Sequence, residues 1–295
     1  MNHISILARM TLREAARRRI VLTGLLLGLC FVVVYSIGFH YVDQQFRVTA
    51  QRVWNNAPPA ASGQGQASVA RAVVAEGDNG LLLAGLYAAT FLSIAMAALL
   101  AADTLAGEIS SGTVQTIVTK PIRRSDVIFG KWLGFAVLLG LYLLLIGGGV
   151  VLSVFVQSGY VAPHMAAGLA LIYMEALLVM TISLACSSAF SGLATGGVVF
   201  GLYGLAFLGG WIEQFGSMLQ NATAVKVGII TSLIIPSETL WRRAAFEMQS
   251  PIAGALGMSP FSAISVPSPL MIAYSAVYLL VVLWIAVRNF QQRDI

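Results

Sequence analysis

Most of the side chains that could do chemical or mechanical work gather in one polar segment, Asp103 to Lys131, which reads DTLAGEISSGTVQTIVTKPIRRSDVIFGK. Apolar residues recur there at steps of three and four, which predicts an amphipathic helix. Pro121 should end this helix near Thr119, because the residue before a proline avoids the α region. Arg123 and Arg124 then form a basic elbow. Such a helix could press on a soluble partner, although a cytoplasmic loop with the usual excess of positive charge explains the same residues.

Glu175 is a second candidate, because it is the one acidic residue well inside a long apolar run. A carboxylate at membrane depth is unfavourable, so such a residue is by default a functional candidate. The alternatives are a carboxylate near the outer interface and a protonated carboxyl that hydrogen-bonds to a neighbouring helix. A structural or gating hydrogen bond is favoured here over the role of a substrate ligand.

Motifs of catalysis and nucleotide binding are absent from the sequence. It contains no GxxxxGK[ST] phosphate loop, no HExxH, no CxxC and no GxSxG. The histidines and cysteines lie in separate segments without ligand partners nearby, at His3, His40, His164, Cys30 and Cys186. We therefore expect a chain that is not an enzyme, with no catalytic residue, no metal site and no bound cofactor. If it moves a substrate uphill, another subunit must hydrolyse the nucleotide.

The composition is that of a membrane protein. Hydrophobic residues make up 58% of the chain and charged residues only 10%, with a mean hydropathy of +0.84. A soluble domain normally carries about 25% charged residues. The formal net charge of +5 fits cytoplasmic loops that face anionic lipid, so it is no argument for nucleic acid binding. The sequence predicts an all-α polytopic membrane protein.

One membrane domain over residues 1–295 should position these residues. Residues 1–19 are rich in arginine and predict an amphipathic helix in the headgroup plane. The apolar run that follows is too long for a signal peptide. Both termini should be cytoplasmic. The six expected spans are about 20–41, 81–102, 132–156, 166–190, 192–211 and 270–287.

The connections between the spans differ in character. Residues 103–131 should be cytoplasmic, whereas 42–80 should form an external, linker-like loop with short flanking helices. Residues 213–269 should also be external and hold re-entrant or interfacial helices, because the apolar stretch 225–235 is too short to span a bilayer. Ser237 should cap a helix that starts near Glu238. Most of the 17 lysines and arginines then lie inside. Those left outside are Arg47, Arg52, Arg71, Lys226, Arg242 and Arg243, and the last two count against this topology.

The fifth expected span is rich in glycine. Small residues four apart let helix backbones approach closely in membranes. We expect this helix to pack against another helix, either within the subunit or across a dimer seam. The residues concerned are Gly192, Gly196, Gly197, Gly201 and Gly204.

This layout resembles the type-2 (ABC-2) permeases of ATP-binding-cassette transporters. The most specific likeness is a cytoplasmic pattern, E-x3-GT-x7-P-x2-R-x5-GK, and the stretch PSETLWRR from Pro236 to Arg243 is also similar to members of this group. In this sequence the pattern is formed by Glu108, Gly112-Thr113, Pro121, Arg124 and Gly130-Lys131.

The resemblance implies that the chain works in a complex with other subunits. Two permease chains, identical or related, would associate in a bacterial inner membrane through spans two and five. Two cytoplasmic ATPase subunits, which hold ATP and magnesium, would bind beneath them. The segment between spans two and three would be a coupling helix that rests on the ATPase, and the N-terminal helix would contact the ATPase too. The coupling residues, mechanical rather than catalytic, would be Glu108, Gly112, Thr113, Lys120, Pro121, Arg123, Arg124 and Lys131.

The function expected from this resemblance is ATP-driven export of a hydrophobic or amphipathic substrate, with the chain contributing the pathway. An apolar seam without a charged cavity favours such cargo. Two alternatives belong to other classes. One is a non-transporting scaffold that recruits a cytoplasmic partner through the same loop, and the other is an ATP-independent channel or carrier.

Overall fold

The computed structural model describes residues 3–55, 64–102, 104, 107, 124–250 and 265–292. Within these ranges the chain forms nine helices and no strand, so the predicted all-α fold is confirmed. The helices are α1 (His3–Arg17), α2 (Arg19–Asn55), α3 (Gln64–Ala102), α6 (Arg124–Ser158), α7 (Met165–Ser187), α8 (Gly192–Met218), α9 (Ala222–Ile234), α10 (Ser237–Met248) and α12 (Pro269–Gln292).

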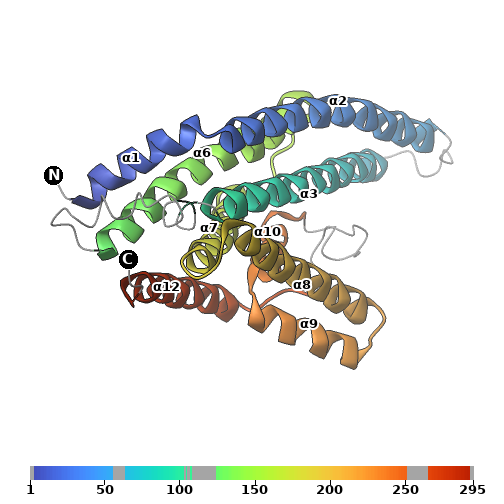
Figure 1. The fold of residues 1–295 in the computed structure, drawn as a ribbon. Helices are drawn as coiled ribbons and strands as arrows, with labels where there is room; N and C mark the ends of the chain where they lie inside the picture. The colour runs from blue at the N-terminus through green and yellow to red at the C-terminus, as the bar shows by residue number, and fades with distance from the viewer. Residues whose placement is uncertain are drawn as a thin grey trace.

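Six of these helices are long and apolar enough to cross a membrane, as predicted. They are α2, α3, α6, α7, α8 and α12. A bilayer core offers no water to the peptide groups, so helices that satisfy their own hydrogen bonds are the structures that can span it. In Figure 1 α1, the end of α3, the start of α6 and the end of α12 lie toward one end of the bundle, and the end of α2 and the start of α3 lie toward the other.

The core of the bundle is built around α7. This helix packs against α3, α6, α8, α10 and α12. Its buried residues include Ile172 and Met180, which belong to the same apolar cluster as Leu86 of α3 and Phe135 and Ile146 of α6. A helix that is apolar all round suits a central position, since no face has to meet water.

The N-terminal helix α1 has the amphipathic character expected for a helix at the membrane surface. Its Thr11 and Ala15 are buried against the bundle, whereas Ile6 and Met10 are exposed. Arg18, just after the helix, pairs with Glu14 at 2.7 Å. The exposed apolar side chains leave α1 a surface that lipid can cover.

The region 42–80 differs from the expected loop with short flanking helices. Instead α2 continues without a break to Asn55, and α3 begins at Gln64. An ion pair four residues apart, Asp43–Arg47 at 2.8 Å, supports the extension of α2. The ring of Phe46 lies against Gly77, where an added Cβ would be 3.3 Å from it. Hydropathy marks where a helix leaves the hydrocarbon, not where it ends, so both helices are longer than their apolar runs.

The expected short helices between the fifth and sixth spans are confirmed as α9 and α10, which are bent by 108° relative to each other. The Asn221 side chain caps α9 by accepting hydrogen bonds from the backbone of Thr223 and Ala224 at 3.0 and 3.2 Å. The capping role predicted for Ser237 is wrong, because α10 begins at Ser237 itself and Pro236 stands at its N-cap without a side-chain hydrogen bond. The proline ring fixes the backbone φ angle of Pro236, at the turn that leads into α10.

Candidate functional site

The polar segment that the sequence singles out lies mostly outside the described residues. Glu108, Gly112, Thr113, Lys120, Pro121 and Arg123 all fall there, and Arg124 is the first residue of α6. The structure does describe the two helices that this segment joins, α3 and α6, and these pack against each other. The candidate coupling segment therefore connects two neighbouring helices of the core.

Lys131 lies on α6 within the described part, where it is 6% exposed. The first turns of α6 pack along α1. A Cβ added at Gly134 would be 2.9 Å from both the Ala8 carbonyl oxygen and the Thr11 Cβ. Only a glycine lets the two helices approach this closely. The N-terminal helix is thus attached to the helix that leaves the polar segment.

Glu175 lies on α7 and is fully buried. Neither of its carboxyl oxygens has a hydrogen-bond partner in the part of the chain that the structure describes. The nearby groups that act on it electrostatically include Glu238 of α10, and Glu175 in turn acts on Tyr203 of α8. The residue is therefore in the middle of the bundle, and the hydrogen bond that the sequence analysis favoured is not found among the described residues.

Glu238 is part of a chain of polar contacts that joins three helices. The Trp211 Nε1 on α8 donates to the Tyr87 hydroxyl on α3 at 3.1 Å, and the Tyr87 hydroxyl hydrogen-bonds to Glu238. The Tyr87 ring lies 4.7 Å from that of Trp241 on α10. A side chain at Gly210 would overlap the Glu238 side chain, so the absence of a side chain at Gly210 leaves the space that Glu238 occupies. These contacts tie α3, α8 and α10 together inside the bundle.

A buried ion pair lies close by, between α8 and α10. The Arg242 Nη1 is 2.6 Å from the Glu213 Oε1, and the two side chains are 4% and 7% exposed. Arg242 Nη2 also donates to the Ser232 hydroxyl at 3.2 Å, and the Ser265 hydroxyl donates to Glu213 at 2.8 Å. The sequence analysis missed this pair. A signal was present, because Glu213 follows an apolar run directly and Arg242 stands among apolar residues of a short helix.

The two arginines that counted against the predicted topology are both paired. Arg242 is neutralised by Glu213, and Arg243 pairs with Glu247 one turn further along α10 at 2.6 Å. Both charges are therefore compensated by acidic side chains of the same subunit.

The glycines of α8 divide into two groups. A Cβ added at Gly209 or Gly216 would collide with α9, so these positions need glycine for close packing within the subunit. A Cβ added at any of four others, Gly196, Gly197, Gly201 and Gly204, would meet no described residue within 4 Å. Gly192 is the first residue of the helix. Among the described residues, no helix of this chain covers that open face of α8.

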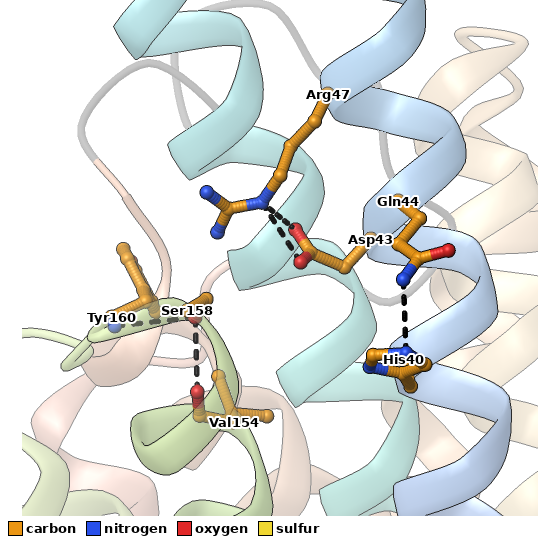
Figure 2. A network of polar contacts seen from close by, with 7 residues as sticks. All are labelled: His40, Asp43, Gln44, Arg47, Val154, Ser158 and Tyr160. Atoms are coloured by element: carbon orange, nitrogen blue, oxygen red, sulfur yellow. Dashed lines mark hydrogen bonds and ion pairs between the residues drawn. The ribbon is translucent and has the colours of Figure 1, made fainter.

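Further polar contacts lie near the C-terminal ends of α2 and α6 (Figure 2). The Arg47 Nε donates to both Asp43 oxygens at 2.9 and 2.8 Å, and His40 and Gln44 are hydrogen-bonded at 2.9 Å on the same helix. At the end of α6 the Tyr160 backbone N–H donates to the Ser158 hydroxyl at 3.2 Å. The pairs on α2 are four residues apart, so they follow from the sequence once the helix is known to extend past its apolar run.

Metal chemistry has no candidate in the described ranges, since three or more His, Cys, Asp or Glu side chains nowhere lie together there. The buried polar residues and the close-packed glycines instead connect helices to one another. Polar contacts join α3, α8 and α10, and close glycine contacts join α1 to α6 and α8 to α9. Such contacts can pass a rigid-body movement from one helix to the next.

Comparison with known proteins identifies one family. The model of a family described as ABC-2 family transporter protein matches residues 6–295, which is nearly the whole chain. A comparison with curated proteins finds no match.

Proposed function

The chain belongs to the ABC-2 family of transporter proteins, and on that basis we propose that it forms the pathway for ATP-driven export of a hydrophobic or amphipathic substrate. As a member of this family it is the membrane permease of an ABC transporter. The chain would bind no cofactor itself. ATP and magnesium would be held by separate cytoplasmic ATPase subunits.

The observation that carries this proposal is the packing around the polar segment 103–131. The helix that enters the segment, α3, and the helix that leaves it, α6, lie against each other in the core. The close contact at Gly134 adds α1 to α6. A push on the segment would therefore reach α1, α3 and α6 together. This supports the coupling role of Glu108, Arg124 and the other residues of the motif.

The proposed assembly contains two permease chains above two ATPase subunits. The uncovered glycine face of α8, Gly196 to Gly204, would meet the second permease, because close helix contacts in membranes favour small residues. The membrane would be a bacterial inner membrane. Both termini and the polar segment would be cytoplasmic, in keeping with the arginine-rich α1.

The test is to purify the tagged chain from native membranes and to measure ATPase activity in the purified material. The wild type is compared with a Glu108→Ala/Arg124→Ala double variant. A matched control replaces another acidic and another basic residue, Arg243→Ala/Glu247→Ala, on α10, which is not one of the two helices that the segment joins. An ATPase subunit should co-purify with the wild type and the control. The coupling variant should lose it, or retain it with turnover that no longer responds to substrate.

Three other outcomes would contradict the proposal. If no ATPase accompanies folded wild-type protein, the chain is not the permease of an ATP-driven exporter. If an ATPase binds but its turnover never responds to membrane substrates, the chain is a scaffold. If the purified chain alone in vesicles passes ions or solutes, it is a channel or carrier.

A further inference from the structure

A cavity of about 560 Å³ lies between the extension of α2, the facing part of α3 and the turn after α6. Its walls carry both signs of charge together with small apolar residues. The polar members are Arg47, Gln51, Arg71, Asp78, Ser158 and Tyr160. Burial raises the pKa of the Tyr160 phenol above its ordinary value of 10.0. That residue is therefore a neutral hydrogen-bonding group.

The two arginines of the cavity can both bind an anion. Arg47 uses its Nε for Asp43, and Figure 2 shows its two terminal nitrogens pointing away from that carboxylate. Arg71 faces the cavity from α3 and is exposed. A guanidinium presents paired N–H groups that match two oxygens of a phosphate.

Asp78 adds a negatively charged group to the cavity, opposite in sign to the two arginines. It is 3% exposed, and its Oδ1 has no hydrogen-bond partner in the described part of the chain. Asp43 and Ser158 hydrogen-bond to the Asp78 carboxyl, and Arg47 is a nearby cation. The remaining buried acceptor, Oδ1, is unfavourable without a donor, and a ligand can supply one. Because the acceptor is a carboxylate, the best donor is a compact cation such as a primary ammonium.

The depth of the cavity agrees with the headgroup layer of a membrane. The apolar run Ile20–Tyr41 at the start of α2 is ~33 Å long at 1.5 Å per residue, close to the thickness of the hydrocarbon core. Asp43 and Arg47 follow directly. On α6 the apolar residues likewise end at Val156, just before Ser158. The charged groups of the cavity are therefore at the level of phosphates.

A second hollow of about 570 Å³ lies on the bilayer side of the first, between α2 and α6. Its apolar lining includes Ile37, Tyr41, Leu152 and Val156, all of them exposed. The Gln157 amide donates to Ser36, but its Oε1 is buried and without a partner among the described residues. This groove offers an apolar surface for chains and a polar group at its upper edge.

We propose that the two hollows together bind a phospholipid whose headgroup carries a phosphate and a primary ammonium, as phosphatidylethanolamine does. The phosphate lies between Arg47 and Arg71, and the ammonium donates to the Oδ1 of Asp78. The glycerol and acyl chains lie in the groove between α2 and α6. This lipid site is separate from the transport function proposed above and does not depend on it.

The experiment uses the purified full chain, stripped of lipid and equilibrated in detergent with equal amounts of phosphatidylethanolamine, phosphatidylcholine and phosphatidylglycerol. The lipid retained per protein is measured by mass spectrometry. The wild type should prefer phosphatidylethanolamine. Asp78→Asn should lower its retention about tenfold and abolish the preference over phosphatidylglycerol. Arg71→Gln should lower the retention of all three lipids.

The control is Arg52→Gln, which removes the same charge as Arg71→Gln but from the extension of α2, at a residue that does not line the cavity. Its lipid profile should equal that of the wild type. Equal retention of the three lipids by the wild type would overturn the proposal, and so would variants without effect. Free phosphoethanolamine that displaces the lipid at similar concentration would indicate a soluble ligand and overturn the lipid assignment. If Asp78→Asn fails to fold, Arg71→Gln decides, because Arg71 is exposed.

Discussion

The Glu213 carboxylate and the Arg242 guanidinium meet at 2.6 Å in the interior of the bundle, where α8 and α10 cross. An apolar setting strengthens their attraction but makes either charge alone very unfavourable. The short helix α10 packs mainly against α7, and the ion pair also attaches it to α8. Between the same two helices, Glu238 lies against Gly210. The ion pair and Glu238 thus both lie between α8 and α10.

Glu213→Gln should lower the free energy of unfolding by about 3–5 kcal/mol, because it leaves the Arg242 charge buried without its counter-ion. The measurement is thermal unfolding in detergent followed by size-exclusion chromatography. The double variant Glu213→Gln/Arg242→Met should recover most of the loss. Glu247→Gln is the control, since it removes the partly exposed pair with Arg243 and should cost at most ~1 kcal/mol. Equal losses for the two single variants would contradict a special role for the buried pair.

Gly134→Val should detach α1 from α6, because a Cβ there would already be 2.9 Å from the Ala8 carbonyl oxygen. Detached α1 should expose its arginines, so trypsin should remove the N-terminal segment faster than in the wild type. Gly148→Val is the matched control on the same helix, where an added Cβ meets nothing within 4 Å. If α1 stays equally protected in both variants, the close contact at Gly134 is not what holds it.

The sequence predicted the all-α fold and the number of spans, because a bilayer imposes a length and an apolar composition that can be counted. The pair α9–α10 was predictable for the same reason, since Val225 to Ile235 is too short to span and Pro236 follows it. The full length of α2 was not predictable in this way. Its polar extension is stabilised by contacts such as Phe46 on Gly77, which only the packed structure reveals.

The candidate site was predictable only where it is local in sequence. Glu175 stood out as an acidic residue in an apolar run, but its neighbour Glu238 belongs to another helix. Glu213 and Arg242 pair through the packing of α8 and α10, which no spacing rule relates. The cavity at Asp78 likewise needs α2, α3 and the turn after α6 to come together.

The open face of α8 predicts an oligomer contact. Gly201→Phe should disrupt the association of two permease chains without unfolding the subunit, because a Cβ added there meets nothing within 4 Å among the described residues. Light scattering of the detergent-solubilised protein should show a lower mass. Gly148→Phe is the control, since it adds the same bulk to an equally open position on α6. An unchanged mass for Gly201→Phe would place the contact elsewhere.

Glu175→Gln should change substrate-stimulated ATP turnover more than it changes assembly. The residue is fully buried, and its oxygens are without partners in the described structure, so the substitution removes no ion pair or hydrogen bond found there. Stability should therefore be equal to or higher than that of the wild type. Turnover should fall if a polar group at the centre of α7 changes its contacts during the transport cycle. The control is Glu247→Gln, which changes a partly exposed carboxyl on α10. If Glu175→Gln instead fails to insert or to associate with its partners, the carboxyl has a structural role and the assignment to the transport cycle is wrong.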